Sequence, residues 1–264
     1  MKSAALVACL TMLVAVCSSA QDWAKAKLEK SPRHGEWVTI KHGERNLQAL
    51  IVYPEVKSKA PVVVVIHEIF GITDWVRGVA DQLAANGYIA IAPDLLSGMG
   101  PNGGRSDAFA GVDAAREAIG KLAPEQVTAD LNAAADYGKK LPASNGKLAV
   151  AGFCWGGGQS FRFATNRKDL AAAFVFYGPP PSSGMENITA PVYGFYGGND
   201  ARISATIPDA EQKLRAAGKK YELVVYEGAG HGFMRGGEDP NGREADKKAH
   251  EEAWQRWLKL LKGM

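Results

Sequence analysis

A single cysteine among glycines is the first residue of this sequence whose type and surroundings point to covalent chemistry. In the stretch VAGFCWGGGQS, Cys154 follows an apolar run and stands two residues before three consecutive glycines. The spacing Gly152-Phe153-Cys154-Trp155-Gly156 predicts a strand, a sharp turn and a helix, in which residues two positions from the thiol must lack side chains. The start of that helix directs N–H groups at the thiol and favours a thiolate. A buried cysteine that acts as a small hydrophobe is the alternative.

A nucleophilic thiol needs a base, and the base needs an orienting group. Asp200 follows the apolar run APVYGFYG, and His231 follows the run YELVVYE in the loop GAGHGF. The order nucleophile, acid, histidine is the chain order of α/β-hydrolases, and each residue comes just after a predicted strand. We therefore predict a Cys154–His231–Asp200 triad. Taken separately, Asp200 is equally a turn former and His231 a surface loop histidine.

Neither a metal nor a cofactor is predicted. His67 ends the apolar run VVVVI beside Glu68, but HEIFG lacks the second histidine of a helical zinc motif. No other His, Cys, Asp or Glu cluster has the spacing of metal ligands, and no glycine-rich phosphate loop of the Walker type is present.

The elements that must position the triad alternate between apolar strands and amphipathic helices. Two short β-like runs around KHGER predict an opening hairpin, and six apolar strands follow at residues 62–66, 88–94, 146–153, 171–178, 190–197 and 220–227. Helices are predicted at residues 74–88, 107–120, 124–140, 207–218 and 243–261. This alternation predicts one domain over residues 21–264 with an α/β-hydrolase fold, a mostly parallel eight-stranded sheet with helices on both faces.

Residues 1–20 predict a secretory signal peptide. A lysine near the start is followed by an apolar run from Ala4 to Val16, which closes on Ser18-Ser19-Ala20 before Gln21. That run is too short to span a bilayer comfortably, so we expect a periplasmic or secreted protein with no stable membrane association after cleavage.

Cleavage of residues 1–20 would leave Cys154 as the single cysteine of the mature chain and allow no intramolecular disulfide. The 31 basic and 28 acidic residues of the whole sequence form no basic stripe, which excludes the electrostatic footprint of a nucleic-acid-binding protein. We expect a monomer.

The sequence resembles the dienelactone hydrolase family of α/β-hydrolases from about Pro61 to Phe233 and on into the last predicted helix. The elements that carry the resemblance are VVVVIHEIFGI, GYIAIAPDLL, VAGFCWGGG, YGGND and GAGHGFMR. The resemblance implies a hydrolase for ester or lactone bonds of small molecules, of the carboxymethylenebutenolidase type. Predicted export departs from the cytoplasmic members of the family and favours a different ester or lactone as substrate.

The resemblance also implies individual roles. Cys154 matches the nucleophile, His231 the base and Asp200 its orienter. Glu68 matches a glutamate that hydrogen-bonds the resting thiol and releases it when substrate arrives. A thiol kept neutral in this way oxidises more slowly than a thiolate, which suits an exported enzyme.

Further matches concern the substrate. The backbone N–H groups of Ile69 and Trp155 match an oxyanion hole. Arg235 matches one of two arginines that grip a substrate carboxylate. Arg105 is the only arginine in the loop LSGMGPNGGRSD, where the family places the second, but its spacing differs and a solvated surface charge is the alternative. Phe70 and Trp155 are candidates for the wall of an apolar pocket, or for core.

Two other functions remain open at this stage. One is a carboxylesterase or thioesterase of broad scope with no need for a carboxylate on the substrate. The other is a non-hydrolytic thiol protein that senses oxidants or binds a ligand through Cys154; this function leaves His231 and Asp200 unexplained.

Overall fold

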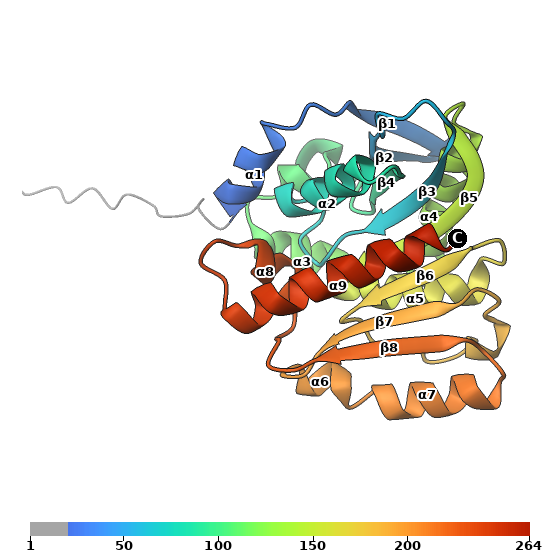
Figure 1. Cartoon of the computed structure of the whole chain (residues 1–264). Helices are drawn as coiled ribbons and strands as arrows, with labels where there is room; N and C mark the ends of the chain where they lie inside the picture. Colours follow the sequence, from blue (N-terminus) through green and yellow to red (C-terminus); the bar gives the residue numbers. More distant parts are fainter. Residues whose placement is uncertain (1–20) are drawn as a thin grey trace, which may run out of the picture.

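The computed structural model describes residues 21–264, so the predicted signal peptide lies outside the described residues. In this part of the chain one sheet has the strand order β1-β2-β4-β3-β5-β6-β7-β8 (Figure 1). The strands are β1 (Gly35–His42), β2 (Arg45–Val52), β3 (Ala60–Ile66), β4 (Ile89–Asp94), β5 (Ser144–Phe153), β6 (Ala172–Phe176), β7 (Val192–Gly197) and β8 (Tyr221–Tyr226).

The sheet is antiparallel only at its first edge. β1 pairs with β2 as the predicted hairpin, and β2 runs antiparallel to β4. All pairings from β4 through β3 and β5 to β8 are parallel. The carboxyl ends of these six strands therefore lie at one edge of the sheet, where an α/β fold places its ligands. The predicted α/β-hydrolase fold is confirmed.

Helices cover both faces of the sheet. The α-helices are α1 (Asp22–Leu28), α2 (Asp74–Ala85), α3 (Val112–Gly120), α4 (Pro124–Lys140), α5 (Trp155–Asn166), α6 (Ala201–Ser204), α7 (Ile207–Ala216), α8 (Phe233–Glu238) and α9 (Glu244–Lys262). α1, α2, α8 and α9 pack on one face, in front in Figure 1, and α4, α5 and α7 pack on the other. Alternate residues of β3 serve the two cores: Val63 and Val65 belong to the first, and Val62 and Val64 to the second. Because β3 is covered on both faces, its run is apolar throughout.

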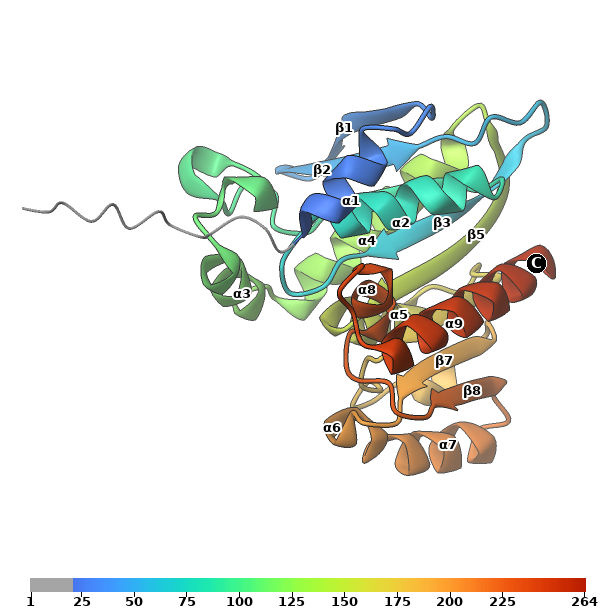
Figure 2. The ribbon, with the colours of Figure 1, turned by 60° about the vertical axis from the view of Figure 1, so that its left-hand side comes forward.

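One predicted helix begins later than expected. A helix was predicted from residue 107, but residues 106–108 form a short 3₁₀ turn and α3 starts at Val112. Ser106 is held by the Asp94 carboxylate, which accepts from both its N–H at 2.9 Å and its hydroxyl at 2.7 Å. This anchoring bends the chain before the helix can begin, and α3 with its preceding loop stands out from the sheet (Figure 2).

No helix within residues 21–264 has both the length and the apolar character needed to cross a bilayer.

We predict that Trp257→Ala destabilises the fold by about 3–5 kcal/mol, because truncation of a large core aromatic leaves a cavity. Trp257 of α9 is fully buried, and its ring meets those of Phe153 and Phe176 at centroid distances of 6.0 and 5.0 Å. The free energy of unfolding in urea measures the loss. The exposed Lys259→Ala is the matched control on the same helix and should change stability by about 0.5 kcal/mol or less.

Candidate active site

Cys154 occupies a strained turn between β5 and α5. Its φ is 57° and its ψ −119°, a left-handed conformation that a side chain rarely adopts. The backbone around it is packed too tightly for side chains: a Cβ on Gly152 would lie 1.9 Å from the Gly156 oxygen. A Cβ on Gly156 would lie 2.4 Å from the His67 oxygen. The glycine spacing of the sequence thus has the steric cause that we inferred for it.

The structure brings the three predicted triad residues together. The Cys154 sulfur lies 3.0 Å from His231 Nε2, and His231 Nδ1 lies 2.5 Å from Asp200 Oδ2. Asp200 is 5% exposed, whereas the imidazole is about one-third exposed. The buried Tyr177 ring meets the imidazole edge-on at 5.1 Å. A carboxylate on Nδ1 fixes the tautomer that leaves Nε2 free to accept the thiol proton.

Two residues outside the triad hold its loops together. Asn199 donates from its backbone N–H to the Ala229 oxygen at 2.9 Å and from its side chain to the Gly228 oxygen at 3.0 Å. The Asp246 carboxylate accepts from the Gly230 N–H at 2.9 Å. The loops of Asp200 and His231 are therefore joined. Neither Asn199 nor Asp246 is singled out by the sequence, because neither contact has a local sequence signal.

The thiol is neutral at ordinary pH. Burial, and next the nearby Glu68 carboxylate, raise the pKa of Cys154 to about 11. The backbone N–H of Trp155 and the charges of Arg202 and Arg235 act in the opposite direction. The resting sulfur is therefore a thiol rather than a thiolate.

Glu68 is close enough to influence the thiol but does not hold it here. Its buried carboxylate accepts from Arg235 Nε at 2.8 Å, and the thiol faces His231 instead. A guanidinium is a far stronger partner for a buried carboxylate than a neutral thiol, which explains the difference from the expected resting contact. The gating role of Glu68 stays a prediction.

The two predicted oxyanion donors come from residues that pack against one apolar cluster. The Trp155 N–H lies at the start of α5, directly after Cys154. None of the hydrogen bonds among residues 21–264 uses the Ile69 N–H, which leaves it available to a ligand. Ile69 and Trp155 both pack against the small apolar cluster of α3, so the protruding α3 backs this side of the site.

Phe70 and Arg105 lie in a pocket beside the triad. The pocket measures about 590 Å³ and its lining includes Trp37, Phe70, Arg77 and Arg105, but none of the triad residues. Phe70 connects it to the site, because the Arg235 guanidinium lies 5.6 Å from the Phe70 ring. Arg105 is held by Asp107 at 2.5 Å and stacks on Trp37 at 3.8 Å. Arg105 is thus engaged by neighbours of its own chain, and its role in substrate binding stays a prediction.

No three His, Cys, Asp or Glu side chains gather closely enough to hold a metal ion in the part of the chain that the structure describes.

The parallel sheet with a strand–turn–helix nucleophile position at its carboxyl edge defines the class of the protein as an α/β-hydrolase. A family model described as "Dienelactone hydrolase family" matches residues 47–264. The chain therefore belongs to the dienelactone hydrolase family.

Individual relatives agree. A Salmonella typhimurium protein named "Putative carboxymethylenebutenolidase" is 35% identical over 212 residues, which cover 75% of each chain. An Escherichia coli K12 protein of the same name is 34% identical over 216 residues, 76% of each chain. A crystal structure from Klebsiella pneumoniae named "Putative Dienelactone Hydrolase" superposes with a TM-score of 0.78 at 28% identity and covers 88% of this chain and 99% of that one. The resemblance and the expectation of a hydrolase for ester or lactone bonds are confirmed; the roles of individual residues stay predictions.

We predict that Glu68→Gln lowers the pKa of Cys154 below about 11, because it removes the carboxylate that disfavours the thiolate and frees the charge of Arg235. Each unit of decrease raises the thiolate fraction at neutral pH about tenfold. The pH dependence of Cys154 alkylation by iodoacetamide measures this pKa. Glu244→Gln, at an exposed position of α9, is the control. An unchanged alkylation profile in Glu68→Gln would show that the carboxylate does not act on the thiol.

Proposed function

We propose that this protein is an exported hydrolase that cleaves ester or lactone bonds of small molecules through Cys154, His231 and Asp200. The observation that carries the proposal is the chain of contacts from sulfur to imidazole at 3.0 Å and from imidazole to carboxylate at 2.5 Å. The three residues come from three loops at the carboxyl edge of the sheet, an arrangement that core packing alone does not require.

The proposed reaction begins with the neutral thiol of Cys154. The Cys154 sulfur forms a bond to the acyl carbon while its proton passes to His231 Nε2, and the carbonyl electrons move to the oxygen. The N–H groups of Ile69 and Trp155 stabilise this oxyanion. The oxyanion collapses, the bond to the alkoxide breaks, and His231 protonates the alkoxide. His231 then takes a proton from water, the hydroxide attacks the thioester, and Cys154 leaves with that proton as a thiol.

We further propose that Arg235 orients a substrate carboxylate. Its Nε is engaged by Glu68, and its two terminal nitrogens make none of the side-chain hydrogen bonds within residues 21–264. Phe70 lies beneath the guanidinium and leads into the neighbouring pocket.

A carboxylesterase or thioesterase of broad scope is the second candidate. The contacts of Arg105 with Asp107 and Trp37 favour it, because they leave Arg235 without the second arginine of a carboxylate clamp. A non-hydrolytic redox role is less well supported, because a thiol with a pKa of about 11 is a poor target for oxidants.

We predict that Cys154→Ala lowers kcat for a small activated ester by about 10³-fold or more, since the covalent route is lost. Steady-state hydrolysis of this ester and of a carboxylate-bearing dienelactone by residues 21–264 tests the proposal. Asn145→Ala, at an exposed position near the start of β5, serves as the control. Wild-type-like turnover in Cys154→Ala would refute the nucleophile.

Arg235 is tested in a background that keeps the charge of Glu68 constant. We predict that Glu68→Gln/Arg235→Met has a KM for the dienelactone about 10- to 100-fold above that of Glu68→Gln, because a charged hydrogen bond contributes about 1.5–3 kcal/mol. KM for a neutral ester should change less than about threefold. Equal losses on both substrates would favour the broad esterase.

Export and the monomeric state are proposals that one preparation tests. Expression of the full chain in a bacterial host should deliver to the periplasm a protein whose mass corresponds to residues 21–264 and whose elution volume is that of one chain. An intact chain in the cytoplasm would contradict export, and a dimer mass would contradict the monomer.

A further inference from the structure

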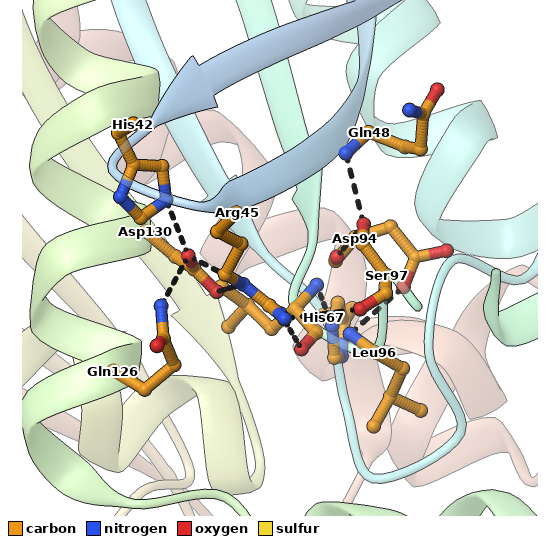
Figure 3. A network of polar contacts seen from close by, with 10 residues as sticks. His42, Arg45, Gln48, His67, Asp94, Leu96, Ser97, Gln126 and Asp130 are labelled. Atoms are coloured by element: carbon orange, nitrogen blue, oxygen red, sulfur yellow. Dashed lines mark hydrogen bonds and ion pairs between the residues drawn. The ribbon is translucent and has the colours of Figure 1, made fainter. Parts of the chain in front are cut away.

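His67 is a buried histidine that the proposed mechanism does not use. It lies between the end of β3 and Glu68 and has no exposed surface. Its Nδ1 lies 2.7 Å from the Glu68 carbonyl oxygen, and its Nε2 lies 3.2 Å from the Leu95 backbone nitrogen. A carbonyl only accepts and a backbone N–H only donates, so Nδ1 carries the proton and Nε2 is the acceptor. Figure 3 shows His67 next to the segment of Asp94, Leu96 and Ser97.

Both ring nitrogens are therefore occupied by backbone groups of two different loops. Burial lowers the pKa of His67, with the charge of Asp94 and the Glu68 oxygen acting in the opposite direction. The ring has no free nitrogen to offer a substrate, which rules out general acid or base work and leaves a mechanical role.

A second contact holds the far end of the same loop. The Ser106 hydroxyl donates to Asp94 at 2.7 Å and accepts from the Ile72 N–H at 2.9 Å. Residues 68–72 are thus attached at both ends to the segment that follows β4. Between these two attachments lies Ile69, whose N–H is the predicted oxyanion donor with no partner among the hydrogen bonds of residues 21–264.

His67 also contacts the other side of the oxyanion hole. Its ring stacks on Trp155 at a centroid distance of 5.7 Å and an interplanar angle of 23°. The turn of Cys154 also comes close to His67, because the Cα of Gly156 faces the His67 carbonyl oxygen. One side chain therefore spans the loop of Ile69, the segment after β4 and the residue that follows the nucleophile.

We propose that His67 is a positioning residue that sets the Ile69 N–H against the Trp155 N–H, so that both reach the oxyanion formed during ester hydrolysis. This inference rests on the proposed hydrolase function. It separates His67 from an ordinary core residue, because its loss should weaken only those steps that place negative charge on the substrate oxygen.

Two reactions of Cys154 make this distinction measurable. Ester hydrolysis forms an oxyanion. Alkylation by iodoacetamide forms a sulfur–carbon bond, expels iodide and passes the thiol proton to His231, with no oxyanion at any stage. We expect His67→Phe, which keeps a stacking ring but loses both hydrogen bonds, to lower kcat about 10- to 100-fold. Its alkylation rate should stay within about twofold of wild type.

His67→Asn is the second variant, in case the first does not fold. Its amide nitrogen can take the place of Nδ1 and donate to the Glu68 oxygen, so we expect a smaller loss in kcat of about 3- to 10-fold with unchanged alkylation. The control is His34→Asn. His34 stacks on Tyr53 at a centroid distance of 5.7 Å, and its side chain makes none of the hydrogen bonds among residues 21–264. His34→Asn should change neither reaction. His42 would not serve, because Asp130, Arg45 and Leu95 connect it to His67 (Figure 3).

A third readout needs no turnover. A trifluoromethyl ketone adds to the thiol by forming a sulfur–carbon bond, with the proton passing to His231 and the charge to the ketone oxygen. Its protection of Cys154 against alkylation should weaken about 10- to 100-fold in His67→Phe and less in His67→Asn. Wild-type protein that binds the ketone but hydrolyses no ester would refute the proposed substrate class and leave His67 testable.

The inference is overturned if hydrolysis, alkylation and ketone protection fall together in the folded His67 variants, which indicates a general loss of structure. It is equally overturned if hydrolysis and ketone protection remain at wild-type levels.

Discussion

The rest of the site depends on a close approach between two backbones. The Cα of Gly156, at the start of α5, faces the carbonyls of Ile66 and His67 at the end of β3, where a Cβ would lie 2.5 and 2.4 Å from their oxygens. This approach brings the nucleophile turn against the loop that carries Glu68 and Ile69. A side chain at Gly156 would push the two apart and separate the thiol from its oxyanion donor. Backbone packing thus sets the distance between the turn of Cys154 and the loop of Glu68 and Ile69, without any contribution from side chains.

Charge in this small space is balanced by one ion pair. Glu68 is buried, and alone it would carry a heavy desolvation cost beside a thiol that has no charge to offer. Arg235, four residues after His231, supplies the compensating charge at 2.8 Å. The same pair links the loop after β3 to α8, so electrostatics and geometry are joined at one contact. Under the proposed function, a substrate carboxylate at Arg235 would compete with Glu68 and alter the potential at the sulfur, so substrate binding would change the state of the thiol.

Local pattern predicted most of the fold and the centre of the site. The apolar run of β3 needs only its own residues to indicate a strand covered on both faces, and the glycines around Cys154 have a steric cause that is visible in the sequence. Asp200 and His231 were found because parallel strands end at one edge. Other features depend on partners distant in sequence. Ser106 bonds Asp94 twelve residues earlier and delays α3, and Arg105 turns to Trp37 rather than to the triad. No periodicity encodes such contacts.

His67 shows where this limit lies. In the sequence, His67 stands beside Glu68, as in a zinc-binding motif, but no second histidine follows at the helical spacing that such a motif needs. Its environment is defined by a carbonyl one residue away and an N–H 28 residues away, and only the fold brings them to opposite sides of one ring. An imidazole is suited to this place because it is a rigid ring with a donor and an acceptor on opposite sides. A buried neutral histidine would keep those roles fixed while, in the proposed reaction, His231 gains and loses a proton. Under that proposal the site uses a histidine twice, once for proton transfer and once to hold the loop that carries the oxyanion donor.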